Sequence, residues 1–236
     1  MAISVRLPEA LFSAKTLLLL ASLAAAGLIG VSLLQDIAIH VLGIIGSDQR
    51  VWVTDVDSEQ TLPAWFSTLL LLAAAAQLFA VARLLRDQPT GLGWLILSLA
   101  FVLLSADEAV SLHGKLSGLV PEGVETTGLF AFAWVIPALI ICAIGFVLYL
   151  PLLLALPRRV RNLLAIAVVM FLGGALGVEM VGGATYEQAG DTLAYRLLAT
   201  LEEALEMFAV IVLLYGLRLY IELLEAQDVA PAERPS

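Results

Sequence analysis

The chain has 236 residues, of which 61% are hydrophobic and only 14% are charged, whereas a soluble domain carries about 25% charged residues. The net charge of −9, without any basic stripe, excludes nucleic acid as a partner. The single cysteine, Cys142, excludes a disulfide framework and a cysteine-based metal site. The apolar runs are too continuous for barrel strands, so we expect an all-α polytopic membrane protein.

Six apolar runs have about the 20 residues that a helix needs to cross a bilayer. The first begins after Arg6 and Lys15 and is too long for a signal-peptide core. Pro137 predicts a kink in the fourth. We expect one transmembrane domain over residues 1–224 and a disordered cytoplasmic tail over 225–236. The expected spans are residues 16–35, 62–85, 92–112, 129–156, 162–181 and 193–224.

Basic residues near the span ends predict the orientation of this six-helix bundle. Six crossings place eight of them on one side of the membrane, namely Arg6, Lys15, Arg83, Arg86, Arg158, Arg159, Arg161 and Arg218. The positive-inside rule makes that side the cytoplasm. Both termini are then cytoplasmic, and we expect the protein in a bacterial inner membrane, as a multi-pass protein in contact with lipid.

Acidic and histidine side chains mark the opposite ends of four of the six expected helices. These residues are Asp36, His40, Asp107, Glu108, His113, Glu179, Glu202, Glu203 and Glu206. A charge near the bilayer centre costs roughly 2.5–3.5 kcal/mol on insertion scales, so such residues are rare and usually functional. Because the inner halves of the helices carry no comparable acids, we predict one shared polar site that opens toward the outside.

The stretch 201–207 is the centre of this predicted site. Glu202 and Glu206 are four residues apart and share a helix face, with Glu203 on its flank. The alternative is a helix start at the interface, where acids face water and favour the helix dipole. Similar alternatives stay open elsewhere: an interfacial histidine at His113, a rim acid at Glu179, and side chains at a loop start for Asp36 and His40.

Carboxylates and imidazoles without thiolates suit hard or borderline divalent cations, such as Mn, Fe or Zn. The predicted ligands are Glu108, His113, Glu179, Glu202, Glu203 and Glu206. The predicted supporting or alternative ligands are Asp36, His40, Ser105 and Asp107. The match to di-metal carboxylate bundles is partial, because the Glu-x-x-His element of that class is missing. No nucleotide-binding fingerprint is present, and no residue is predicted to be catalytic.

Four segments carry a resemblance to a known group of proteins. They are Ser105–His113, Phe132–Pro137, Gly177–Gly183 and Leu201–Met207. Together they resemble a family of uncharacterised bacterial multi-pass inner-membrane proteins, over roughly residues 95–220. In that family the histidine is typically followed by Glu, where this chain has Gly114. The resemblance implies the fold and carries no activity.

Three hypotheses follow from these patterns. In the first, the outward-facing site binds a divalent cation or protons. In the second, the protein is a metal-dependent enzyme that acts on a lipid or quinone entering from the bilayer. In the third, the protein is an accessory subunit of a larger membrane complex, or a homo-oligomer. Transport through the bundle is disfavoured, because the inner halves of the helices are apolar apart from Gln77 and Ser98.

Overall fold

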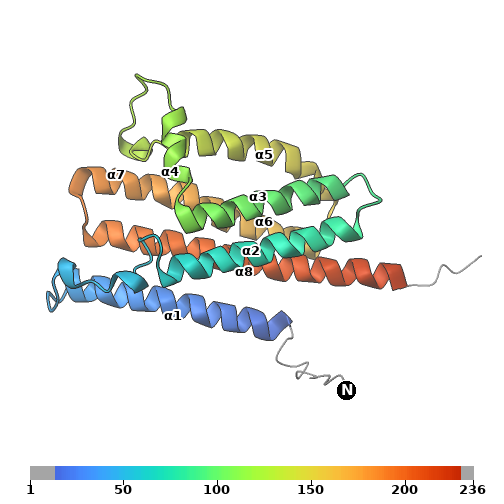
Figure 1. The fold of residues 1–236 in the computed structure, drawn as a ribbon, viewed down its shortest axis with the longest axis horizontal. Helices are drawn as coiled ribbons and strands as arrows, with labels where there is room; N and C mark the ends of the chain where they lie inside the picture. Colours follow the sequence, from blue (N-terminus) through green and yellow to red (C-terminus); the bar gives the residue numbers. More distant parts are fainter. Residues whose placement is uncertain (1–13, 230–236) are drawn as a thin grey trace, which may run out of the picture.

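The computed structural model describes residues 14–229 and is built of helices and connecting loops over that range (Figure 1). Six helical segments are long and apolar enough to cross a membrane. They are α1 (Ala14–His40), α2 (Leu62–Leu84), α3 (Gly91–Val110), α5 (Val135–Ala155), the continuous α6–η6–α7 (Arg158–Leu172, Gly173–Val178 and Glu179–Ala189) and α8 (Leu193–Val229). The predicted all-α polytopic fold is therefore confirmed.

Several helix ends differ from the predicted ones. The fifth span continues as α7 to Ala189, because Gly183 packs under the Phe132 ring and the helix ends only at Gly190, whose φ is +68°. In the fourth span, Pro137 lies in the first turn of α5, where proline is tolerated and no kink is required. Of the predicted tail, the part to residue 229 is helical, and residues 230–236 lie outside the described range.

Helix α8 is the central helix of the bundle. It packs against α1, α2, α6, η6 and α7. Met207 and Leu217 on α8 are almost fully buried, together with Leu78 and Val81 on α2 and Trp94 on α3. The acids of α8 therefore lie on a helix that neighbouring helices surround on several sides.

Helix α5 lies at the periphery, at the top of Figure 1. Val135 is its one buried residue, whereas large side chains such as Ile140, Val147 and Leu148 are exposed along its length. The segment that leads into α5 is anchored to α7, since Glu187 accepts a hydrogen bond from the N–H of Gly128 at 2.6 Å. An apolar exposed surface of this kind suits contact with lipid chains.

One end of the bundle, on the left in Figure 1, gathers the loops that matter for the site. The 41–61 segment contains η2 (Ser47–Gln49) and η3 (Trp52–Thr54), and it leads into α2 through Thr61, whose hydroxyl accepts from the N–H of Ala64. After α3, Ser111 adopts a left-handed conformation with φ +51°, and the chain turns into α4 (His113–Leu116). Next come η4 (Ser117–Leu119) and η5 (Gly128–Phe130).

Candidate functional site

A cavity of about 350 Å³ lies at this loop-bearing end of the bundle. Seven predicted site residues line it, namely Asp107, Glu108, His113, Glu179, Glu202, Glu203 and Glu206. Asp57 and Glu59 from the 41–61 segment add two more acids to its lining. We call it the acidic cavity, because its described lining holds these eight carboxyl groups and one histidine but neither Lys nor Arg.

The acids surround this space and do not meet at one point. Within residues 14–229, the structure holds no group of three or more His, Cys, Asp and Glu residues that could hold a metal ion. The sequence-based prediction that these side chains share a region is consistent with the cavity. A compact ligand sphere for a divalent metal is not formed by the described side chains.

The acids of α8 are well inside the helix. The helix begins at Leu193, so Glu206 lies about 20 Å along its axis at 1.5 Å per residue. Glu202, Glu203 and Glu206 are partly buried and line the acidic cavity, rather than an open helix start. The carboxyl groups of Glu202 and Glu179 lie close enough to interact electrostatically. Two carboxyl groups that share a site cannot both carry a charge without a cost in free energy.

The close approach of η6 to α8 sets the position of these acids. At Gly174, an added Cβ would lie 3.0 Å from the carbonyl oxygen of Glu202 and 3.3 Å from Cγ of Glu206. Glycine therefore lets the two backbones approach at this point. The neighbouring Gly173 and Gly177, which form the Gly-xxx-Gly pattern, have nothing within 4 Å of an added Cβ. Segment η6 is π-helical and ends immediately before Glu179, and such turns occur frequently at functional sites.

His113 is held at the rim of the cavity by two neighbours. Its Nδ1 lies 3.1 Å from Oδ2 of Asp107, and its ring packs against Trp134 with centroids 4.8 Å apart and an angle of 53° between the ring planes. The hydrogen bond to Asp107 raises the pKa of His113, although burial opposes this. Trp134 in turn donates from Nε1 to Glu179 at 3.2 Å. Asp107 therefore supports His113, while Glu108 lines the cavity without a hydrogen bond to another described residue.

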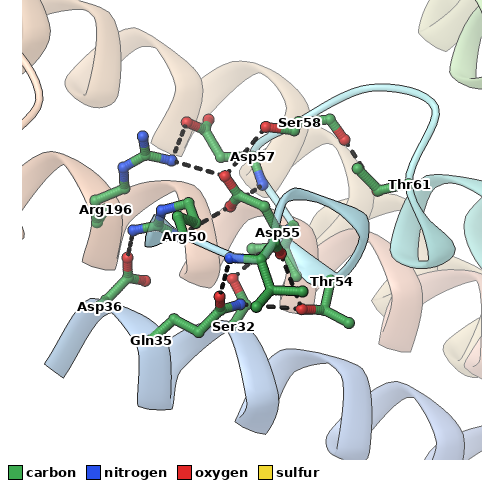
Figure 2. Close-up of polar contacts among 12 residues, drawn as sticks. Ser32, Gln35, Asp36, Arg50, Thr54, Asp55, Asp57, Ser58, Thr61 and Arg196 are labelled. Carbon is green, nitrogen blue, oxygen red and sulfur yellow. Dashed lines mark hydrogen bonds and ion pairs between the residues drawn. The ribbon is translucent and has the colours of Figure 1, made fainter. Parts of the chain in front are cut away.

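A second polar cluster lies beside the cavity and joins α1, the 41–61 segment and α8 (Figure 2). Arg50 forms ion pairs with Asp36 and Asp55. Arg196 of α8 pairs with Asp55 at 3.3 Å and with Asp57 at 2.8 Å. Two arginines thus pair with three aspartates, and pairing of this kind offsets the cost of burying charged groups.

Asp57 belongs both to this ionic network and to the cavity lining. Burial raises its pKa to about 6, although Arg196 and the Tyr195 hydroxyl, which donates to Oδ1 at 2.9 Å, favour the charged form. Arg196 also binds Asp191, and this hydrogen bond lowers the pKa of Asp191. Protonation of Asp57 would therefore weaken the link between the 41–61 segment and α8.

Three predicted supporting residues lie outside the cavity lining. Asp36 pairs with Arg50, as described above, and Ser105 donates from Oγ to the carbonyl oxygen of Thr68 at 2.9 Å. His40 is partly buried, and its Nε2 has no hydrogen-bond partner among the described residues. Asp36 and Ser105 thus form structural contacts, and none of the three residues lines the cavity.

Sequence reasoning did not assign Asp57, Arg196 or Trp134 to the site. Arg196 precedes Glu203 by seven residues, two helical turns, so both occupy one face of α8. The sequence therefore contained one indication of an ionic network, namely an arginine on the helix that carries the three membrane acids. For Trp134, no local sequence pattern predicts the hydrogen bond that it donates to Glu179.

A comparison with known protein families shows which family the chain belongs to. It matches a family described as a domain of unknown function (DUF8692) over residues 16–220. The chain belongs to the DUF8692 family. The comparisons with curated proteins and with solved structures gave no match. Membership covers most of the chain and all six candidate spans at least in part, and the family description carries no activity to transfer.

Proposed function

We propose that this DUF8692 protein is an integral protein of a bacterial inner membrane that binds cations in its acidic cavity, on the outer side. The observation that supports this is the charge of the lining, in which eight acids and one histidine face a shared space without a lysine or arginine. Acids cannot remain charged together in a poorly hydrated site, so protons or a bound cation must neutralise them. The outward orientation follows from the positive-inside rule.

Two sources of positive charge are compatible with this chemistry. A divalent ion such as Mn, Fe or Zn would take carboxylate oxygens and the Nε2 of His113, with water completing its ligands. Glu108, Glu179, Glu202, Glu203 and Glu206 would have to move toward one another to hold it. Protons need no such movement, because each carboxyl group can take up a proton in its present position.

The test compares the detergent-purified native protein with a Glu203→Gln/Glu206→Gln variant, and uses Glu222→Gln as the matched control. Glu222 also lies on α8, but it pairs with Arg218 away from the cavity. Elemental mass spectrometry measures metal content, and infrared spectroscopy measures the C=O stretch of protonated carboxyl groups. Metal lost only in the double variant assigns a metal site. A protonated-carboxyl band lost only in that variant assigns protons. If the folded native protein shows neither bound metal nor a protonated-carboxyl band, the proposal of cation binding is overturned.

A second candidate function rests on the Asp107–His113 pair. A carboxylate that holds Nδ1 leaves Nε2 as the free nitrogen, which is the arrangement used by many metal ligands and general bases. The protein would then be an enzyme acting on a lipid or quinone. Mass spectrometry of membrane lipids from cells producing the native protein or a His113→Gln variant tests this, and identical lipid profiles would exclude it. An accessory role in a larger complex or a homo-oligomer stays a prediction.

A further inference from the structure

The wall of the acidic cavity that α5 and α6 form is apolar. Three α5 side chains at helical spacing, Ala138, Ile141 and Cys142, line the cavity, together with Phe171 and Leu172 of α6. The acids come from α3, α7, α8 and the 41–61 segment. The cavity is therefore amphipathic, since both carboxyl groups and hydrocarbon side chains line it.

The cavity also reaches the outer surface of the bundle next to α5. Ile141 lines the cavity and is nevertheless 58% exposed, so the cavity extends to the lipid-facing side of this helix. Helix α5 is held near its start by Val135 and by Trp134, and beyond its end by the buried Leu156. Further along the helix, the Tyr149 hydroxyl donates to the carbonyl oxygen of Gly93 on α3 at 3.3 Å. Between its start and Tyr149, the helix borders the cavity.

Two carboxyl groups in the cavity have no hydrogen-bond partner among the described residues. Glu203 and Glu206 are partly buried and line the cavity, and neither forms a hydrogen bond with another described residue. The arginines of the adjacent network are already engaged by aspartates. A buried polar group without a partner is costly, and this cost favours a ligand that supplies donors and positive charge.

We propose that the ligand of the acidic cavity is an amine-bearing amphiphile that enters from the bilayer beside α5. Its ammonium group lies against Glu203 and Glu206, and its hydrocarbon chain lies along Ala138, Ile141 and Cys142. This proposal rests on the cation binding proposed above, and it identifies the cation as the ammonium group of an amphiphile. An ammonium group provides three donors and one charge, and its chain matches the apolar wall. The cavity volume lies within the range of small-molecule pockets, about 300–1,000 Å³.

The lone cysteine provides a reporter at the proposed entrance. In lipid nanodiscs, Cys142 is labelled with a lipid-soluble maleimide or with a charged, water-soluble methanethiosulfonate, in the presence of dodecylamine, dodecanol or dodecanoate. We expect the maleimide to react at least tenfold faster than the charged reagent. We expect dodecylamine to slow that reaction at least fivefold at a concentration where dodecanol and dodecanoate change it less than twofold.

Two variants make the outcome specific. Glu203→Gln/Glu206→Gln retains Cys142 labelling and loses protection by the amine. In a Cys142→Ala background, Val147→Cys places a thiol at a lipid-exposed position of α5 outside the cavity lining, and dodecylamine leaves its labelling unchanged.

Each other result counts against the proposal. A Cys142 that reacts only with the charged reagent, or with neither, overturns entry from the bilayer. Equal protection by amine and alcohol overturns recognition of the head group by the acids. If metal or protons are lost in the double glutamine variant while dodecylamine gives no protection, cation binding stands and the amphiphile is excluded.

Discussion

Asp107 holds His113 through both of its oxygens: Oδ2 lies 3.1 Å from the imidazole Nδ1, and Oδ1 accepts the backbone N–H of His113 at 2.5 Å. The two residues are six apart, and the left-handed Ser111 between them turns the chain back on the end of α3. The carboxylate thereby caps the first turn of α4 and orients the imidazole at the rim of the acidic cavity.

The first prediction concerns the pKa of His113. The hydrogen bond to Asp107 raises this pKa above the ordinary value of 6.5, so the resulting stabilisation is present below pH 6.5 and is lost as the pH rises through the folded-state pKa. Asp107→Asn should lower the pKa toward 6.5 or below it. The chain has two histidines, so a His40→Gln background leaves one imidazole to titrate by NMR.

The matched control for this titration is Glu222→Gln, a neutralised acid on α8 outside the cavity lining. It should leave the pKa of His113 unchanged. If Asp107→Asn also leaves it unchanged, then Asp107 does not stabilise the charged imidazole.

The sequence predicted the helices well, because a bilayer requires long apolar helices and the chain shows six such runs. It misplaced the end of the fifth helix, because Gly182 and Gly183 look like loop residues in isolation. In the structure Gly183 is instead a contact point for Phe132, 51 residues earlier in the chain. Contacts of this sequence separation leave no trace in local periodicity.

For the candidate site, the sequence predicted only that the acidic side chains lie in one region of the protein. Acids at one end of several spans indicated a common region, and six of them line one cavity together with His113. The assignment of Asp36 to that region did not anticipate Arg50, which reaches it from the 41–61 segment. The path of that segment depends on its own turns and on its ion pairs with Arg196. The spacing of residues along the helices therefore could not predict that Arg50 would be the partner of Asp36.

The second prediction concerns Gly174. In Gly174→Ala, the new Cβ would lie 3.0 Å from the carbonyl oxygen of Glu202, which is closer than ordinary contact. Overpacking of this kind costs about 1–3 kcal/mol and should push η6 away from α8. Denaturant unfolding in detergent measures the loss. Gly177→Ala is the matched control, because nothing lies within 4 Å of its added Cβ, and equal effects of the two changes would contradict the proposed contact.

The third prediction concerns the pH dependence contributed by Asp57. Burial raises its pKa in the folded protein to about 6 from the ordinary 3.8, so the folded state binds more protons than the unfolded state between these values. The contribution of Asp57 to stability therefore falls as the pH rises from about 4 to about 6. Over that interval Asp57→Asn should gain stability relative to the native protein. A relative loss would mean that pairing with Arg196 outweighs burial.

The fourth prediction concerns the link between α1 and the 41–61 segment. In Arg50→Gln, Asp36 and Asp55 lose the charge of Arg50, and both are almost fully buried. Breaking a buried pair by removing one partner costs about 3–5 kcal/mol, because the remaining charge is uncompensated. Arg86→Gln is the control, since Arg86 pairs with Asp87 on the exposed surface and should change stability by less than about 1 kcal/mol. The difference between the free energies of unfolding of the two variants, measured in detergent, tests this prediction. Equal losses in Arg50→Gln and Arg86→Gln would mean that the buried ion pairs of Arg50 contribute no more to stability than the exposed pair of Arg86.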